Sequence, residues 1–158
     1  MKPILYAEDE KNDAFFMERA FEKVGISNPL IVVSDGQAVI DYLAGALKDA
    51  DPSQPPTISL LLLDLNLPKK SGLEVLKWVR AQPVLRTLPV LMITASIEEA
   101  DLQRAYSQGA NAYLVKPAKP ADLVAMVQSI QDFWLTQNRP AAKGWITTEP
   151  AGKRNPIL

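Results

Sequence analysis

The stretch Ile58-Ser-Leu-Leu-Leu-Leu-Asp64-Leu-Asn-Leu-Pro68 decides the fold that this sequence predicts. Its short apolar run, closed by Pro68 and Gly72, is typical of a central strand that is buried on both faces. Burying the ionised carboxylate of Asp64 at the end of such a strand is costly unless a cation or a reaction uses it. Asp64 is therefore a candidate functional residue. The simpler alternative at this point is an Asp that only caps the following helix.

Three further apolar runs end in polar side chains that suit the same site. The run Pro3–Ala7 leads into the acidic pair Glu8-Asp9. The run Leu88–Thr94 ends in a hydroxyl, and the run Ala112–Lys116 ends in a cation. Helical stretches separate these runs, so we expect a parallel sheet with right-handed crossovers and all strand carboxyl ends on one edge. Four polar strand ends converging there are hard to explain by chance.

Composition narrows the class of protein. At 158 residues with 47% hydrophobic residues and a net charge of −1, the chain fits one folded domain and is not an electrostatic nucleic-acid binder. No apolar run approaches the roughly 20 residues that span a bilayer. The absence of cysteine permits a reducing cytoplasm, and the absence of histidine closes His-based acid–base schemes. The opening Met1-Lys2-Pro3 predicts no signal peptide, so we expect a cytoplasmic protein without a membrane partner.

Apolar periodicity and caps predict the remaining elements. A second strand is expected at Leu30–Ser34, and the last stretch, Asn138–Leu158, has no sustained period. We therefore assign residues 1–137 to the domain and 138–158 to a tail that is flexible or contacts a partner. The predicted first-helix core comprises Phe16, Met17, Ala20, Phe21 and Val24. The first helix is predicted from Asn12 or Asp13 to Val24, and the second from Asp35 or Gly36 to about Leu47. The third is predicted at about Leu73 to Ala81, and the fourth at about Glu98 to Ser107 with Ser96 as its cap. The fifth is predicted to start near Pro120.

The order of Glu8-Asp9, Asp64, Thr94 and Lys116-Pro117 resembles the receiver domain of bacterial two-component response regulators. The resemblance covers about residues 3–135 and implies a five-stranded doubly wound sheet in the order 2-1-3-4-5, a flavodoxin-like three-layer sandwich. Further matches lie at Asn66, Pro68, Gly72, Gly109, Ala110 and Tyr113, and the segments Leu65–Gly72 and Asp132–Leu135 resemble the single-domain regulators of phytochrome-type histidine kinases.

The residues at the acidic edge favour a magnesium site. Glu8, Asp9 and Asp64 place three carboxylates in one pocket, where their repulsion would raise at least one pKa unless a cation intervenes. Carboxylate ligands without His or Cys favour Mg²⁺ over zinc. The resemblance implies that Asp9 and Asp64 coordinate directly, that Glu8 acts through water, and that the Asn66 carbonyl is the third protein ligand. It also implies that Asp64 accepts a phosphoryl group from the phosphohistidine of a partner kinase.

The resemblance assigns roles to the other strand ends as well. Lys116 would offset the charge of the phosphoryl group, while the Thr94 hydroxyl and the Ala95 main-chain N–H would contact its oxygens. Thr94 and Tyr113 would form the switch pair, with Tyr113 turning inward after phosphorylation. The Lys116–Pro117 bond is expected to be cis. Asn66 and Ser96 would modulate hydrolysis, so we expect a phosphoacceptor signalling protein with slow self-dephosphorylation and not an enzyme.

The output surface is expected at helix four, strand five and helix five. Phe133 and Trp134 add apolar surface to the end of helix five, and clustered apolar residues usually mark an association site. The resemblance suggests a homodimer through this face. The alternative is that both side chains close the core of the domain.

Other functions fit the pattern less well. A receiver that binds partners without being phosphorylated is one alternative. A phosphatase of the haloacid dehalogenase type would carry Asp-x-Asp after the first strand, whereas here Asp64 follows the third and Asn66 lies two residues on. A flavin carrier would need a phosphate cradle where the acidic run Glu8-Asp9-Glu10 would repel phosphate.

Overall fold

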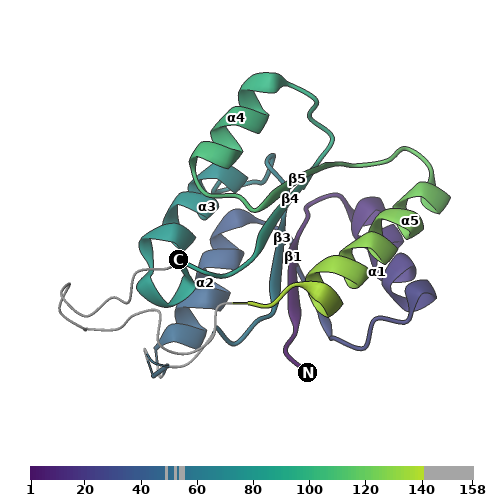
Figure 1. Ribbon diagram of the computed structural model, residues 1–158. Helices are drawn as coiled ribbons and strands as arrows, with labels where there is room; N and C mark the ends of the chain where they lie inside the picture. The colour runs from purple at the N-terminus through teal and green to yellow at the C-terminus, as the bar shows by residue number, and fades with distance from the viewer. Residues whose placement is uncertain (49, 52, 54–55, 141–158) are drawn as a thin grey trace, which may run out of the picture.

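A five-stranded parallel sheet forms the centre of the molecule, with strands in the order β2-β1-β3-β4-β5 (Figure 1). The computed structural model describes residues 1–48, 50–51, 53 and 56–140. The order confirms the predicted doubly wound, flavodoxin-like architecture. In chain order the elements are β1 (Ile4–Ala7), α1 (Lys11–Val24), β2 (Leu30–Val33), α2 (Gly36–Leu47), β3 (Leu60–Leu63), α3 (Gly72–Ala81), β4 (Val90–Thr94), α4 (Glu99–Ser107), β5 (Ala112–Val115) and α5 (Pro120–Ile130).

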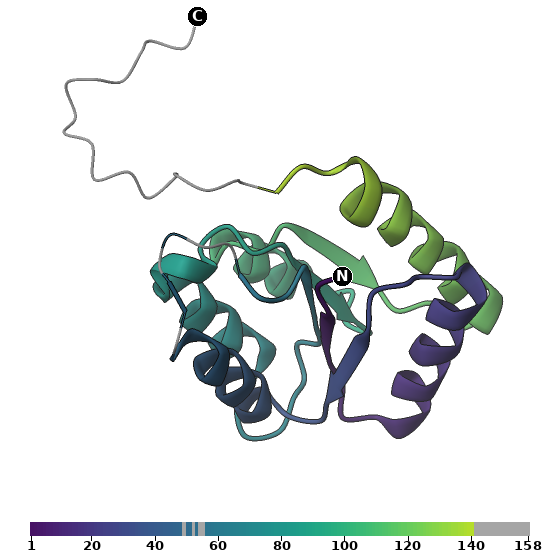
Figure 2. The ribbon, with the colours of Figure 1, turned by 90° about the horizontal axis from the view of Figure 1, so that it is seen from below.

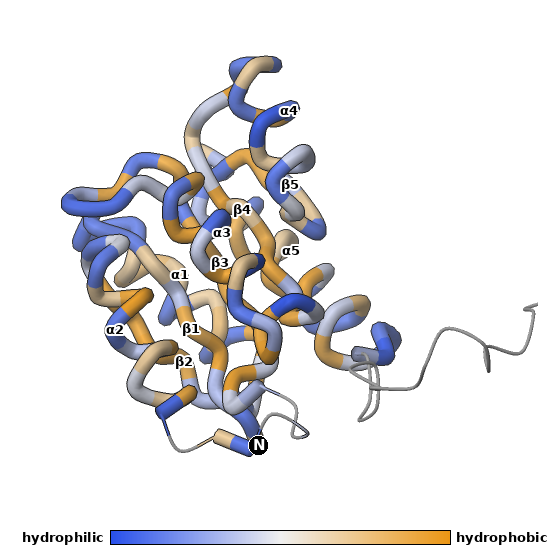
Figure 3. The backbone as a smooth tube through the Cα atoms, turned by 90° about the vertical axis from the view of Figure 1, so that its left-hand side faces the viewer, coloured by the Kyte–Doolittle hydropathy of each residue, from blue (hydrophilic) through white to orange (hydrophobic). Residues whose placement is uncertain are grey.

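Helices cover both faces of the sheet, which makes three layers. The helices α1 and α5 pack on one face, and α2, α3 and α4 pack on the other (Figures 1 and 2). Successive side chains of β3 pack on alternate faces of the sheet. Leu60 and Leu62 join the core beneath α1 and α5, whereas Leu61 and Leu63 join the core on the opposite face. Because both faces are covered, a central strand is apolar at every position, as the hydropathy colours of Figure 3 show.

Specific hydrogen bonds mark the ends of several helices. Gly25 ends α1 in the left-handed region at φ 82°, and its N–H donates to carbonyls of the last turn. Asp35 caps α2 by accepting a hydrogen bond from the Ala38 N–H. A capping box joins Ser71 and Glu74 at the start of α3. The caps at Asp35 and Ser71 fix loops that leave the carboxyl edge of the sheet.

Two predicted helix starts are wrong. The helix α1 begins at Lys11, so Asn12 and Asp13 lie inside its first turn and do not cap it. The N-cap of α4 is Glu98, and Ser96 lies two residues earlier. The Ser96 hydroxyl still accepts a hydrogen bond from the Glu98 N–H at 3.3 Å, so it stabilises the loop before the helix and is not the N-cap residue.

The described helices include none long and apolar enough to cross a membrane.

The predicted core of α1 is confirmed except at one position. Met17, Ala20 and Phe21 are buried and Val24 packs against the same core, but Phe16 is 42% exposed. Phe16 lies at the edge of the buried stripe, where α1 turns toward solvent beside α5. With the exposed Phe15 it lines a groove of about 720 Å³ between the two helices.

Candidate functional site

Four strand ends meet at one edge of the sheet, as the sequence predicts. The register pairs Ala7 with Leu63, so Glu8 and Asp64 leave adjacent strands side by side. The strand β4 ends at the fully buried Thr94, which pairs with Val115, the residue before Lys116. The Lys116 N–H also donates to the Thr94 carbonyl at 2.8 Å. The backbone alone therefore brings these groups together.

The ammonium of Lys116 lies at the centre of the site. Its Nζ is 2.7 Å from the Asp64 Oδ2, and it also donates to the carboxylates of Glu8 and Asp13. Burial on its own would lower the pKa of Lys116, but hydrogen bonds and charge from Asp64 and Glu8 outweigh it, so the pKa is raised. Lys116 is thus a fixed cation at neutral pH.

Glu8 is a buried carboxylate with one oxygen unused. Its side chain is fully buried, and the Oε2 atom has no hydrogen-bond partner among the described residues. Burial and the nearby Asp64 together raise the pKa of Glu8 to about 8, although Lys116 opposes the shift. Such a group is unusual without a cation or proton to satisfy it.

The acidic residues can hold a divalent cation. Oxygen atoms of Glu8, Asp9 and Asp64 lie within 4.8 Å of one another. Glu8 and Asp64 are buried, whereas Asp9 is exposed at the entrance. An all-oxygen set with one unused buried oxygen suits a hard cation, and a bound charge of +2 would relieve the repulsion among the carboxylates.

The loop after β3 fixes the position of Asp64. The Asn66 N–H donates to Asp64 Oδ1 at 3.3 Å, and the Asn66 side chain is exposed beside it. The Gly72 N–H donates to the Leu65 carbonyl at 2.8 Å. A Cβ atom on Gly72 would lie 2.1 Å from the Asp64 carbonyl oxygen. Only glycine therefore fits where α3 starts against the site.

Ser96 connects the two residues of the predicted switch pair. Its N–H donates to Thr94 Oγ1 at 3.3 Å, and its carbonyl accepts a hydrogen bond from the Tyr113 hydroxyl at 3.0 Å. Its own hydroxyl donates to Asp101 on α4 at 2.6 Å. The Tyr113 ring already packs against the core under α3 and α4, and burial raises its pKa, so the phenol remains a donor. A movement of Tyr113 after phosphorylation stays a prediction, with the bond to Ser96 as its starting point.

Two features of the site differ from expectation. The expected cis bond between Lys116 and Pro117 is wrong, because the described residues contain no cis peptide bond. In the trans form, which X-Pro bonds ordinarily favour, the Lys116 side chain still reaches the carboxylates. The second difference is Asp13, which contacts Lys116 at 3.1 Å. Its place just after the acidic pair is the signal that the sequence offers, although the sequence alone favours a helix cap there.

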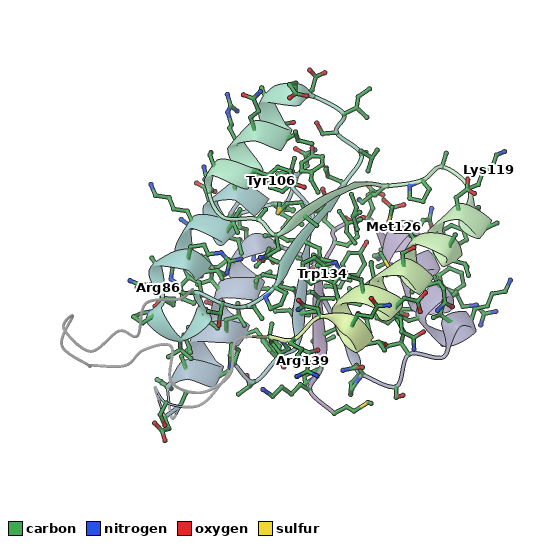
Figure 4. The ribbon with its side chains drawn as sticks, viewed as in Figure 1. Arg86, Tyr106, Lys119, Met126, Trp134 and Arg139 are labelled. Carbon is green, nitrogen blue, oxygen red and sulfur yellow. The ribbon has the colours of Figure 1, made fainter. Side chains whose placement is uncertain are left out.

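The predicted partner face is partly apolar. Phe133 is 49% exposed and stacks edge-to-face on Trp134 at 4.9 Å. Trp134 itself packs against the core beneath α1 and α5, so the alternative of core closure holds for Trp134 and not for Phe133. Both lie on a π-helical extension of α5, Gln131–Gln137. Figure 4 shows Trp134 and Tyr106 on the two sides of β5.

Sequence comparisons identify the family. The response regulator receiver domain matches residues 4–128. The probable methanogenesis regulatory protein FilR2 of Methanothrix harundinacea is 40% identical over 136 residues, which cover 86% of this chain and 85% of that protein. The response regulator Rcp1 of Synechocystis is 39% identical over 142 residues, which cover 89% of this chain and 95% of Rcp1.

Solved structures agree with the sequences. The phosphorylated cyanobacterial phytochrome response regulator RcpA matches with a TM-score of 0.78 at 34% identity, covering 89% of this chain and 99% of RcpA. The Mn²⁺-bound form of Rcp1 matches with a TM-score of 0.76 at 37% identity, covering 90% of this chain and all of that one. The strand order, the converging strand ends and these matches together show that the chain belongs to the response regulator receiver family of two-component signalling proteins.

Proposed function

We propose that Asp64 accepts a phosphoryl group from the phosphohistidine of a partner kinase. The observation that carries this is the 2.7 Å contact between Asp64 Oδ2 and Lys116 Nζ at the end of a buried strand. A carboxylate oxygen attacks phosphorus, the P–N bond to the imidazole breaks, and the histidine nitrogen takes the bonding electrons. The product is an acyl phosphate on Asp64.

The acidic group is proposed to bind Mg²⁺. Asp9 and Asp64 would ligate it directly, Glu8 through water, and the Asn66 carbonyl would complete the protein ligands. The donor set is all oxygen, and the unused Oε2 of Glu8 gives a water ligand an acceptor. When bound, the cation supplies positive charge to oxygens of the transferring group.

The chain's own groups then orient and stabilise the phosphoryl group. Lys116 brings a fixed positive charge, and stabilising charge is the main catalytic contribution in phosphoryl transfer. The Thr94 hydroxyl and the Ala95 N–H are proposed donors to phosphoryl oxygens; Ala95 is exposed at the site, so its small side chain leaves room. Asn66 and Ser96 flank the site and would set the rate of slow self-dephosphorylation.

The phosphoryl donor is proposed to be a phytochrome-type histidine kinase in the cytoplasm. RcpA is described as a cyanobacterial phytochrome response regulator, and the similar protein RPA3017 of R. palustris as a response regulator in red light signaling. The net charge of −1 gives no electrostatic attraction toward nucleic acid, so the output is proposed to be a protein contact.

Phosphorylation with a small donor tests the site. Wild-type protein, incubated with acetyl phosphate and Mg²⁺, should gain one acid-labile phosphoryl group by intact-mass measurement. Asp64→Asn should gain none, while folding as wild type by circular dichroism. If Asp64→Asn is still labelled, another residue is the phosphoacceptor. A wild-type protein that stays unlabelled would favour a receiver that acts without phosphorylation, and steady turnover of a phosphate ester would favour a phosphatase.

The output face is proposed to bind a second copy of this chain. Besides Phe133, the elements of this face carry the exposed large apolar residues Tyr106 on α4 and Val115 on β5. A two-fold axis would bring this surface against its own copy. Residues 138–158 are proposed as a tail outside the domain, of which 141–158 lie outside the described residues.

A further inference from the structure

Every hydrogen-bond donor of Lys116 is already engaged. An ammonium has three N–H donors and no acceptor, and Lys116 contacts three carboxylates, those of Glu8, Asp13 and Asp64. When a phosphoryl donor reaches Asp64 as proposed above, an oxygen of its phosphoryl group needs a donor on Lys116 while Asp64 is still an ionised carboxylate. One of the present contacts must then be given up.

The three carboxylates differ in what it costs to release them. Before the transfer, the side chain of Glu8 is 0% exposed and that of Asp64 is 7% exposed, so either carboxylate would lose a buried ion-pair partner if Lys116 released it. The Asp13 side chain is 45% exposed. Water can solvate it as soon as Lys116 turns away, and exposed ion pairs contribute little to stability.

The surroundings of Asp13 leave room for such an exchange. Asp13 and Lys116 together line a pocket of about 130 Å³ between α1 and the chain that leads from β5 into α5. This volume is enough for several water molecules, each of which occupies about 30 Å³ in the liquid. Lys119 also lines this pocket, so a second cation forms part of its wall. Released from Lys116, the Asp13 carboxylate stays nearly half exposed to solvent.

We infer that Asp13 is a positioning residue for phosphoryl transfer: it holds Lys116 toward Asp64 before the reaction and gives up this place to a phosphoryl oxygen. Its negative charge also opposes the arrival of an anionic phosphoryl donor. Asp13 thereby holds Lys116 in position, but it also slows the arrival of the phosphoryl donor at Asp64. This inference rests on the proposed role of Asp64.

Replacing the charge of Asp13 tests the inference. With saturating Mg²⁺ and subsaturating acetyl phosphate, Asp13→Asn should be phosphorylated about two- to five-fold faster than wild type, the range that exposed charge pairs produce. Phosphoramidate carries one net negative charge less than acetyl phosphate at neutral pH, so the gain with it should be smaller. Asp13→Glu restores the charge and should return both rates toward wild type.

A second variant separates the contact with Lys116 from general charge. Glu10→Gln also removes one negative charge, from the exposed residue that precedes α1. Glu10 is not among the described contacts of Lys116. The variant should change the phosphorylation rate with either donor less than two-fold. A structure of the beryllofluoride complex should show Lys116 on the fluoride group and parted from Asp13.

Any one of four results would overturn the inference. The first is an equal rate for Asp13→Asn and wild type, and the second is an equal gain with both donors. The third is a gain for Glu10→Gln as large as that for Asp13→Asn, and the fourth is an Asp13–Lys116 contact that persists in the beryllofluoride complex. In each case labelling of wild type at Asp64 would leave the proposed function standing. Loss of labelling in wild type would instead reject the proposed function itself. A loss of helical stability in Asp13→Asn without a change in donor preference would assign Asp13 to the α1 dipole alone, against the inference.

Discussion

Gly72→Ala should damage both the fold and the site, because the first residue of α3 lies directly against the backbone of Asp64. The added Cβ would lie 2.1 Å from the Asp64 carbonyl oxygen and 2.8 Å from the Leu65 Cα. Real Cβ atoms keep at least 3.0 Å, so the two backbones must part by about 0.9 Å. Both neighbours are main-chain atoms in a buried loop, and neither can rotate away.

The expected size of the effect follows from that displacement. Forced overpacking of a buried site costs about 1–3 kcal/mol, and a main-chain obstacle places Gly72→Ala at the upper end. Moving a reacting group by about 1 Å can cost on the order of 100-fold in rate. We therefore expect the free energy of unfolding to fall by about 2–3 kcal/mol and phosphorylation by acetyl phosphate to slow at least ten-fold.

Gly45→Ala is the matched control. Gly45 lies exposed within α2, and a Cβ there would meet nothing within 4 Å. The same substitution should stabilise the protein by about 0.5–1 kcal/mol, since alanine is the better helix former. Urea unfolding measures both variants, and the labelling rate is read under conditions where each is folded. A Gly72→Ala protein as stable and as reactive as wild type would refute the claim that this contact fixes Asp64.

Two further predictions concern stability and association. Arg80→Met should lower the free energy of unfolding, measured in urea, by about 3–4 kcal/mol. The reason is that the half-buried guanidinium donates hydrogen bonds to four main-chain carbonyls and to Asn111. A loss below about 1 kcal/mol would mean that water satisfies these acceptors in the variant. Phe133→Ala should weaken self-association in sedimentation experiments with little loss of stability, whereas Trp134→Ala should cost about 2–3 kcal/mol by removing core contacts. A wild-type protein that stays monomeric at high micromolar concentration, even when phosphorylated, would contradict the dimer.

The sheet and its polar edge could be predicted because both follow from short stretches of sequence. A run such as Leu60–Leu63 has no polar position, so it must be covered on both faces. Parallel strands then place their carboxyl ends on one edge, whatever the details of the helices. The positions of Glu8, Asp64, Thr94 and Lys116 depend only on that rule, and all four meet.

Contacts made across the fold had no comparable local signal. Arg80 is an ordinary helical residue in the sequence, yet its partners Gly109 and Asn111 lie 29 and 31 residues later. Ser96 has the composition of a helix cap, but its hydrogen bonds to Thr94, Tyr113 and Asp101 make it a connector between two strands and a helix. Phe16 is predicted to be in the core but is 42% exposed, because the helical period gives the centre of a buried stripe more accurately than its edges.

Lys116 shows most clearly where sequence reasoning ends. Strand pairing fixes its Cα atom to within one residue, which is why its place beside Asp64 was predictable. Its flexible four-carbon side chain, however, selects partners by reach and by the cost of leaving charges buried, and these depend on atoms from α1 as well as on the strand ends. Asp13 satisfies both conditions: it projects from the first turn of α1 within 3.1 Å of the ammonium and remains half in water. The pattern of strand ends cannot reveal Asp13, because the geometry of α1, and not the strand register, determines its position near Lys116.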